Sequence, residues 1–125
     1  MNKDSYLYTK EHEWIAIDDD TAIVGITDYA QSELGDIIFI ELPNEGDAFS
    51  SGDVFGTIEA VKTVADLFMP ISGTIIDINN EIEDNPEIVN SNAFDSGWIV
   101  KIKIDNKDEV KHLLSESDYN KLINE

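Results

Sequence analysis

Hydrophobic and polar residues alternate along most of this chain in short runs, and glycine, asparagine or aspartate interrupts these runs at regular intervals. Alternation with a period of two is typical of β-strands, so the pattern predicts a chain built mainly from short strands. Near the N-terminus it predicts a strand over residues 13–17, an acidic turn over 18–20 and a second strand over 21–26.

The middle of the chain predicts one short helix and a hairpin that ends in a lysine. Asp28 is placed as an N-cap and Gly35 as a stop, so a helix is expected over residues 28–35. Lys62 separates two β-prone runs, so we expect it at a hairpin tip. The other elements expected here are a buried strand over 36–42, a turn over 43–47, strands over 54–61 and 65–69, a break over 70–73, a strand over 74–78 and an acidic loop over 79–86.

The last part of the chain predicts one more strand and a helical tail. Over residues 97–104, the alternation places Ile99 and two lysines on one face of a strand. The other face, expected in the core, carries Trp98, Val100, Ile102 and Ile104. Capping-box patterns that begin at Asn106 and Ser115 predict short helices over residues 106–125.

Composition and charge narrow the possible functions. The 125 residues fit one domain, 1–125, and the absence of cysteine excludes disulfides, thiolate metal sites and cysteine nucleophiles. A net charge of −19 disfavours nucleic acid and anionic membranes as partners, because binding them requires cationic side chains. No targeting segment or membrane-spanning run is recognisable, so we expect a cytoplasmic, bacterial protein.

Lys62 is the candidate for chemistry. The chain has 8 lysines and no arginine against 27 acidic residues, and Lys62 is flanked by Val61, Thr63 and Val64. A free lysine is a poor nucleophile at neutral pH, so such a residue suits covalent modification, although composition alone favours an ordinary solvated lysine on an edge strand. The two histidines are not at metal-ligand spacing, and the acids at 81–84 lack a calcium-loop pattern, so no metal site is expected.

Several stretches, spread in order over nearly the full chain, resemble the H proteins of the glycine cleavage system, which are lipoyl carriers of the biotinyl/lipoyl attachment family. The stretches are Glu11-His12-Glu13-Trp14-Ile15, Val24 to Gln31, Leu34 to Pro43, Glu59-Ala60-Val61-Lys62, Pro70-Ile71-Ser72-Gly73 and Gly97 to Ile102. The helix expected near residue 30 and the helical tail also match H proteins, and separate the chain from the shorter lipoyl domains of 2-oxo acid dehydrogenases. The resemblance implies a mainly β barrel-sandwich hybrid, similar to a lipoyl domain, with a short internal helix and C-terminal helices.

The same resemblance implies a non-catalytic carrier with lipoic acid amide-linked to Lys62. Such a carrier holds an aminomethyl group on its dihydrolipoyl arm, while the chemistry belongs to the partner enzymes. The implied partners are a pyridoxal-phosphate glycine decarboxylase (P protein), a tetrahydrofolate-dependent aminomethyltransferase (T protein), dihydrolipoyl dehydrogenase (L protein), and a lipoate ligase or lipoyltransferase.

The resemblance also assigns roles to residues around the lysine. Glu13 and Asp66 are expected to accept hydrogen bonds from the cationic amine of the loaded arm, which would shelter it from water. Glu59 and Gly46 match positions that guide the lipoylating enzyme, although Gly46 also suits a turn that needs positive φ. Val64 and Ala65 depart from the family pattern, as does Glu11, where some relatives carry serine.

Two alternatives remain open from the sequence. The lipoylated protein could serve mainly as a lipoyl donor from which a transferase relays lipoate to 2-oxo acid dehydrogenases. It could also be an unmodified binding module of the same fold.

Overall fold

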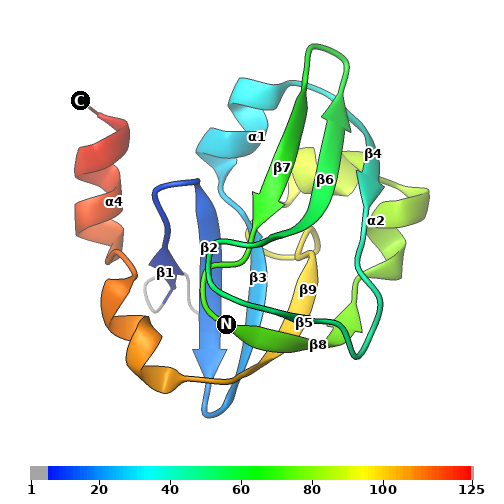
Figure 1. The fold of residues 1–125 in the computed structure, drawn as a ribbon. Helices are drawn as coiled ribbons and strands as arrows, with labels where there is room; N and C mark the ends of the chain where they lie inside the picture. The colour runs from blue at the N-terminus through cyan, green and yellow to red at the C-terminus, as the bar shows by residue number, and fades with distance from the viewer. Residues whose placement is uncertain (1–5, 125) are drawn as a thin grey trace.

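The computed structural model describes residues 6–124 and contains two β-sheets with a few short helices (Figure 1). The larger sheet has the strand order β1-β2-β3-β9-β8-β5, and the smaller has the order β4-β6-β7. All the strand pairs are antiparallel. The predicted mainly β fold class is confirmed. Residues 1–5 and 125 of the predicted domain lie outside the described residues, and these include most of the N-terminal segment in which a targeting signal would begin.

The strands and helices are short, as the spacing of turn residues predicts. The strands of the larger sheet are β1 (Leu7–Tyr8), β2 (Glu13–Asp18), β3 (Thr21–Ile26), β5 (Ala48–Phe49), β8 (Gly73–Ile78) and β9 (Val100–Ile104). The strands of the smaller sheet are β4 (Ile37–Glu41), β6 (Val54–Ala60) and β7 (Val64–Phe68). The helices are α1 (Asp28–Leu34), α2 (Asn80–Asp84), α3 (Glu87–Ser91), the 3₁₀ helix η2 (Lys107–His112) and α4 (Glu116–Ile123).

Isoleucines from both sheets, from α2 and from the segments that precede β8 and β9 fill the main core. Those with at most 1% exposure are Ile15, Ile40, Ile58, Ile71, Ile75, Ile82, Ile99 and Ile102. A second, aromatic cluster contains Tyr6, Tyr8, Trp14 and Tyr119, and it joins β1 and β2 to α4. The outward orientation predicted for Ile99 is therefore wrong. Strand β9 begins only at Val100, so the alternation does not extend back to Ile99, whose N–H instead donates to Val24 O at 2.8 Å.

Helix α1 is capped by Thr27 rather than by Asp28. The Thr27 hydroxyl accepts a hydrogen bond from Ala30 N at 3.2 Å, and Asp28 is the first residue of the helix. A carboxylate in the first turn is favourable beside the positive end of the helix dipole. The predicted stop at Gly35 is confirmed, since this residue adopts a φ of 82° that favours glycine.

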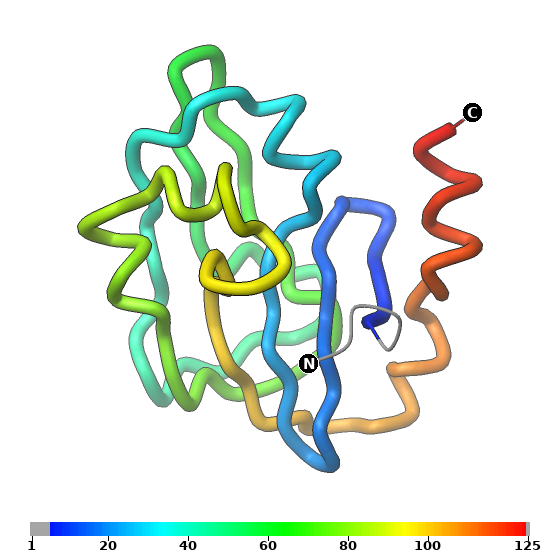
Figure 2. Tube along the Cα trace, turned by 180° about the vertical axis from the view of Figure 1, so that it is seen from behind, coloured from blue at the N-terminus to red at the C-terminus, as the bar shows by residue number. Residues whose placement is uncertain are grey.

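The segment predicted as an acidic loop over residues 79–86 instead forms α2 and leads into α3. Asn79 caps α2 by accepting a hydrogen bond from Glu81 N. Each helix inserts one fully buried apolar side chain, Ile82 from α2 and Val89 from α3. Because each helix has only five residues, its apolar periodicity is too short to recognise in the sequence. Both helices lie against β4 in the two views (Figures 1 and 2).

Strand β4 is only partly buried, although it was predicted as a buried strand. Ile37 and Ile40 are 3% and 1% exposed, whereas Ile38 and Phe39 are 57% and 49% exposed. The pairing of β4 with β6 shifts between Ile37 and Phe39, as in a β-bulge. A bulge interrupts the alternation of faces and leaves the two apolar side chains on the outside.

The predicted helical tail is formed by η2 and α4. Asn106 caps η2 and Ser115 caps α4, and both were expected to open helices. Glu109 does not close a capping box on Asn106; its carboxylate accepts hydrogen bonds from the amide and hydroxyl of Ser72 at 2.7 and 3.1 Å. Figure 2 shows α4 standing beside the strands of the N-terminal half. Within residues 6–124, we find no helix that combines the length and hydrophobicity of a transmembrane segment.

Candidate functional site

Lys62 lies in the tight turn of the hairpin formed by β6 and β7. Ala60 N donates to Thr63 O at 2.8 Å, so Val61 and Lys62 form a two-residue loop. The hairpin projects at one end of the molecule, beside α1 (Figure 1). Lys62 is exposed, as is Val61, whose side chain is 70% exposed. The structure therefore presents the predicted lysine at a hairpin tip, accessible to another protein.

The hairpin tip is held by the segment between α1 and β4. Val61 N donates to Asp36 O at 2.9 Å. The side chain of Lys62 extends over Gly35, where an added Cβ would lie 3.5 Å from Lys62 Cδ. This segment is fixed in turn by Asn90 of α3, whose amide donates to Gly35 O at 2.9 Å and accepts from Ile37 N at 2.9 Å. Asn90 was not predicted as a functional residue, because nothing local to α3 indicates a contact with residues more than fifty positions earlier.

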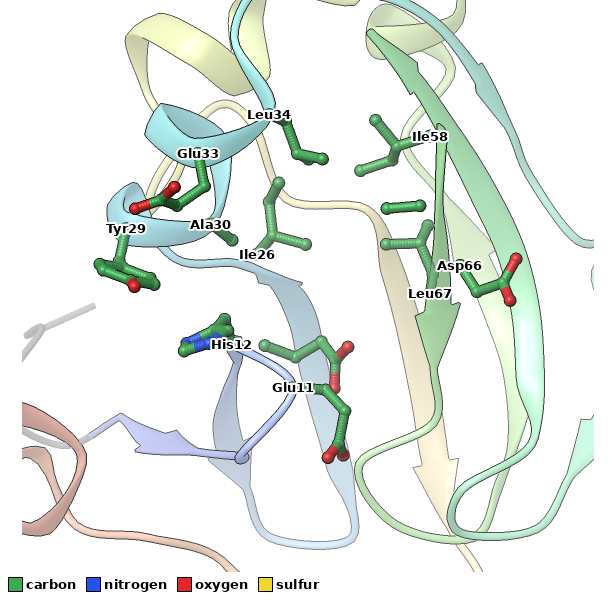
Figure 3. A pocket seen from close by; sticks show the side chains of 12 residues that line it. Glu11, His12, Ile26, Tyr29, Ala30, Glu33, Leu34, Ile58, Asp66 and Leu67 are labelled. Atoms are coloured by element: carbon green, nitrogen blue, oxygen red, sulfur yellow. The ribbon is translucent and has the colours of Figure 1, made fainter. Parts of the chain in front are cut away.

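A cleft of about 340 Å³ lies beside the hairpin, between α1, β7 and the turn that leads into β2 (Figure 3). Its apolar wall is formed by Ile26, Ala30, Leu34, Ile58, Ala65 and Leu67. Its polar lining includes Glu11, His12 and Glu13 from the turn before β2 and the start of that strand. The cleft thus combines an apolar wall, suited to an aliphatic chain, with carboxylates that suit a cationic group.

Glu13 is the buried acid of this cleft, with 2% exposure. Thr9 Oγ1 donates to Glu13 Oε1 at 2.8 Å, and Phe68 N approaches Glu13 Oε2 at 3.4 Å. Burial raises the pKa of the Glu13 carboxyl from 4.5 to about 7, although both hydrogen bonds oppose this change. The charge of Glu11 adds to the increase. Glu13 is therefore a carboxyl group whose ionised form would be stabilised by a cation in the cleft.

Asp66 also lies at the cleft, but its side chain is exposed. In Figure 3, its carboxylate points away from the cavity, on the opposite side of β7 from Leu67. Successive side chains of a strand alternate between faces, so Ala65 and Leu67 face the cleft and Asp66 does not. The structure thus brings Glu13 into the cleft but leaves the Asp66 carboxylate outside it.

The two residues predicted to guide a lipoylating enzyme lie in different places. Glu59 is exposed on β6, where it pairs with Val64 across the hairpin. Gly46 is in the segment between β4 and β5, which lies at the other end of the molecule from the hairpin tip (Figure 1). Its φ of 93° favours glycine, and its N–H donates to Ile75 O at 2.8 Å. The turn geometry is therefore a structural reason for glycine at this position, separate from the predicted recognition role.

His12 lines the cleft, although no functional role was predicted for it from the sequence. Its φ of 69° is unusual for a residue other than glycine. Its Nδ1 lies 2.8 Å from the hydroxyl of Tyr119, and that hydroxyl lies 2.7 Å from Thr27 Oγ1. The ring also packs against Tyr29, with the centroids 4.7 Å apart. Burial lowers the pKa of His12, although Glu11 and Glu33 oppose this change. His12 thus connects the cleft to α4.

Among residues 6–124, no group of three or more His, Asp or Glu side chains is placed to hold a metal ion. Two β-sheets with a lysine at an exposed hairpin tip define a domain of the lipoyl-domain-like, barrel-sandwich class. A crystal structure of a glycine cleavage system H protein from Mycobacterium marinum has this fold, with a TM-score of 0.89 and 32% sequence identity over 99% of this chain and 100% of that one. This similarity confirms the predicted fold class.

Sequence comparisons identify the family. The family model described as Glycine cleavage H-protein matches residues 6–125. A glycine cleavage system H protein of Staphylococcus epidermidis is 49% identical over 120 residues, 96% of this chain and 95% of that protein. One of Listeria monocytogenes is 50% identical over 117 residues, 94% of each chain. The chain belongs to the glycine cleavage H-protein family, which confirms the resemblance found in its sequence.

Proposed function

We propose that this chain is the lipoyl carrier of a glycine cleavage system, with lipoic acid joined to Lys62 through an amide bond. The observation that carries the proposal is the exposed lysine at a hairpin tip beside a cleft that contains one buried carboxyl group. When attached, the lipoyl disulfide supplies a sulfur that accepts an aminomethyl group, and it is regenerated by oxidation of the resulting dithiol. The chain itself binds, orients and shelters the arm.

The dimensions and lining of the cleft fit such an arm. Its volume of about 340 Å³ lies within the range of about 300–1,000 Å³ that small-molecule sites occupy. Strand β7 leads from the hairpin tip along the cleft to Phe68, whose amide approaches Glu13. An arm that folds back from Lys62 along β7 would place its aliphatic part against Ile58 and Leu67.

Glu13 is placed to hold the cationic end of a loaded arm. A neutral carboxyl group with a pKa of about 7 loses its proton readily when a cation approaches, and the resulting ion pair is stronger away from water. Thr9 would keep its donor on Glu13 Oε1, and the amine would bind Glu13 Oε2, which accepts only a long bond of 3.4 Å from Phe68 N. The exposed carboxylate of Asp66 would assist only after a change of its rotamer, so Glu13 is the principal acceptor.

The proposed partners follow from the carrier role. Glycine decarboxylase would load the arm, the tetrahydrofolate-dependent aminomethyltransferase would unload it, and dihydrolipoyl dehydrogenase would reoxidise it. A lipoate ligase or lipoyltransferase would form the amide at Lys62, guided by Glu59 and Gly46. The chemistry belongs to these partners, so we propose that this chain is a non-catalytic component of the system. We also propose that it acts in the cytoplasm.

The direct test is the intact mass of the protein after incubation with lipoate, ATP and a lipoate ligase, followed by peptide mapping. We expect one lipoyl group confined to Lys62, and no addition in Lys62→Arg. Glycine-dependent loading by the decarboxylase should then require the lipoylated form. An unmodified mass with the fold intact by circular dichroism would overturn the proposal and favour an unmodified binding module.

A further inference from the structure

Most of the large apolar side chains that are exposed among residues 6–124 lie on the smaller sheet and its hairpin tip. Seven large hydrophobic side chains are exposed among residues 6–124, and five of them lie on this sheet and its hairpin tip. These five, called here the apolar outer face, are Ile38, Phe39, Val54, Val61 and Val64. The other two, Ile76 and Leu122, lie on β8 and α4. Such clustering of exposed apolar side chains marks an interaction surface.

Strand register explains how the central members of this face come together. Phe39 pairs with Glu59, and Glu59 pairs with Val64 on the next strand. Residues directly opposite each other in neighbouring strands share a face of the sheet. Phe39 and Val64 are 49% and 62% exposed, whereas Ile58, on the inner face of β6, is 1% exposed. Phe39, Glu59 and Val64 therefore form a row of side chains that points to solvent, with the acid between the two apolar residues.

The surroundings of this face are acidic. The next row of the sheet pairs Glu41 with Thr57 and Thr57 with Asp66. Both acids are exposed, as is Asp36 beside the hairpin tip. Lys62 is the only cationic residue between Asp36 and Phe68. A complementary surface would present apolar side chains surrounded by lysine or arginine, which would also accelerate its encounter with a chain of net charge −19.

We propose that the apolar outer face is the docking surface of the enzyme that acylates Lys62, and that this enzyme contacts it with apolar side chains flanked by basic ones. The inference rests on the proposed function, because it requires Lys62 to be the acylated residue. Val61 adjoins Lys62 and Val64 follows two residues later, so two exposed apolar side chains lie next to the residue that is acylated.

Position also distinguishes this enzyme from the partners that act on the finished arm. The cleft proposed to hold the arm is lined by Ile58 and Leu67, on the inner face of β6 and β7. The apolar outer face is on the opposite side of the same two strands. An enzyme that acts on the far end of the arm approaches the cleft, whereas the acylating enzyme acts at the hairpin tip.

The test compares acylation kinetics of the full-length protein with a purified lipoate ligase, lipoate and ATP. The test variant is Phe39→Ser/Val64→Ser, and Val61→Ser is a second, single variant in the turn. The control is Ile76→Ser, which removes an apolar side chain of 40% exposure from the other sheet. Circular dichroism and urea unfolding would establish that each variant is folded.

We expect the double variant to raise the KM of the ligase for the protein by about tenfold or more, which is typical of losing interface side chains that contribute strongly to binding. Val61→Ser should raise it by at least about threefold, and Ile76→Ser should leave it within about twofold. Added salt should raise the KM of the wild-type protein.

Three results would overturn the inference. The double variant could be acylated with an unchanged KM, or the KM for the control could rise as much as the KM for the double variant. The double variant could also be acylated normally but fail in glycine-dependent loading, which would assign the face to the decarboxylase. Absence of acylation of the wild-type protein at Lys62 would instead overturn the proposed function and, with it, this inference.

Discussion

The backbone N–H of Val61 donates to the carbonyl oxygen of Asp36 at 2.9 Å, which ties the lysine hairpin to the segment that follows α1. The position of the Lys62 side chain therefore depends on how firmly this segment is held. The amide group of Asn90 holds it, with bonds of 2.9 Å to Gly35 O and Ile37 N and 3.0 Å to Gln31 Oε1.

We predict that Asn90→Ala loosens the hairpin tip. The substitution removes three hydrogen bonds and leaves Ile37 N without this acceptor, so we expect a loss of about 1–3 kcal/mol in the free energy of unfolding. Urea unfolding measures this loss, and hydrogen exchange of the Val61 amide reports the tip directly. We also expect slower acylation of Lys62, because the lysine is less well positioned.

Asn92→Ala is the matched control for this prediction. The side chain of Asn92 is exposed, and within residues 6–124 its amide makes only a 3.4 Å bond to the neighbouring Ser91 hydroxyl. We expect a change of less than about 0.5 kcal/mol, with exchange at Val61 as in the wild type. Equal effects of the two substitutions would contradict a specific role of Asn90 at the hairpin.

The example of Asn90 also shows what the sequence could and could not predict. Alternation and turn residues predicted the longer strands and the hairpin tip, because these are local patterns that depend directly on backbone conformation. The two-residue strands β1 and β5 were not predicted. Asn90 contacts α1 and β4 across more than fifty residues, and no local pattern encodes that contact. The exposure of Ile38 and Phe39 was missed for a related reason, since a bulge cannot be recognised within a uniformly apolar run.

The candidate site was also predictable only in part from the sequence. The hairpin that presents Lys62 follows from two β-prone runs, and the role of Glu13 was implied by the family motif around it. The burial that raises the pKa of Glu13 depends on packing of β2 against β7, so the sequence alone did not predict it. The alternation of apolar and polar residues along β7 indicates that Asp66 points outward, as Figure 3 shows. The prediction that Asp66 binds the arm followed the family resemblance and not this local pattern.

The raised pKa of Glu13 predicts a pH-dependent difference between the wild type and Glu13→Gln. The folded pKa of about 7 exceeds the ordinary value of 4.5, so the folded state binds the proton more tightly than the unfolded state. The resulting stability is fully present below pH 4.5 and is lost as the pH rises through 7. The full loss is about 3 kcal/mol, at about 1.4 kcal/mol per pKa unit.

Glutamine resembles the neutral carboxyl group and does not titrate, so Glu13→Gln avoids this loss. We expect the unfolding free energy of the variant to increase relative to the wild type by about 2 kcal/mol between pH 5 and pH 8. Urea unfolding of both proteins at the two pH values measures the difference, in which the contributions of the other acids cancel. A difference that does not change with pH would show that Glu13 titrates normally.

Gly25→Ala is predicted to disturb the aromatic cluster. An added Cβ at this position would lie 2.6 Å from two carbon atoms of the Trp14 ring. Trp14 is 1% exposed, and its indole N–H donates to Ala93 O at 2.8 Å, so the ring cannot move without losing packing or this bond. We expect a loss of about 1–3 kcal/mol, as for other overpacked cores, with altered near-ultraviolet circular dichroism. Unchanged spectra and stability would contradict this packing.

The hydroxyl of Tyr119 connects α4 to the cleft. The hydroxyl of Tyr119 lies 2.8 Å from His12 Nδ1 and 2.7 Å from Thr27 Oγ1, and Thr27 is also the cap of α1. Tyr119→Phe removes both hydrogen bonds but keeps the ring that stacks on Tyr8. Because Thr27 is 1% exposed, its hydroxyl loses a partner that water cannot readily replace.

We therefore expect Tyr119→Phe to lower the free energy of unfolding by about 1–3 kcal/mol and to increase hydrogen exchange in both α1 and α4. Tyr29→Phe is the control, because Tyr29 also packs against His12, but its hydroxyl has no hydrogen-bond partner among the described residues. The control should change stability by less than about 0.5 kcal/mol. If only α4 exchanged faster, the hydroxyl would hold the tail alone. Faster exchange in α1 as well would show that the C-terminal helix helps to shape the wall of the cleft.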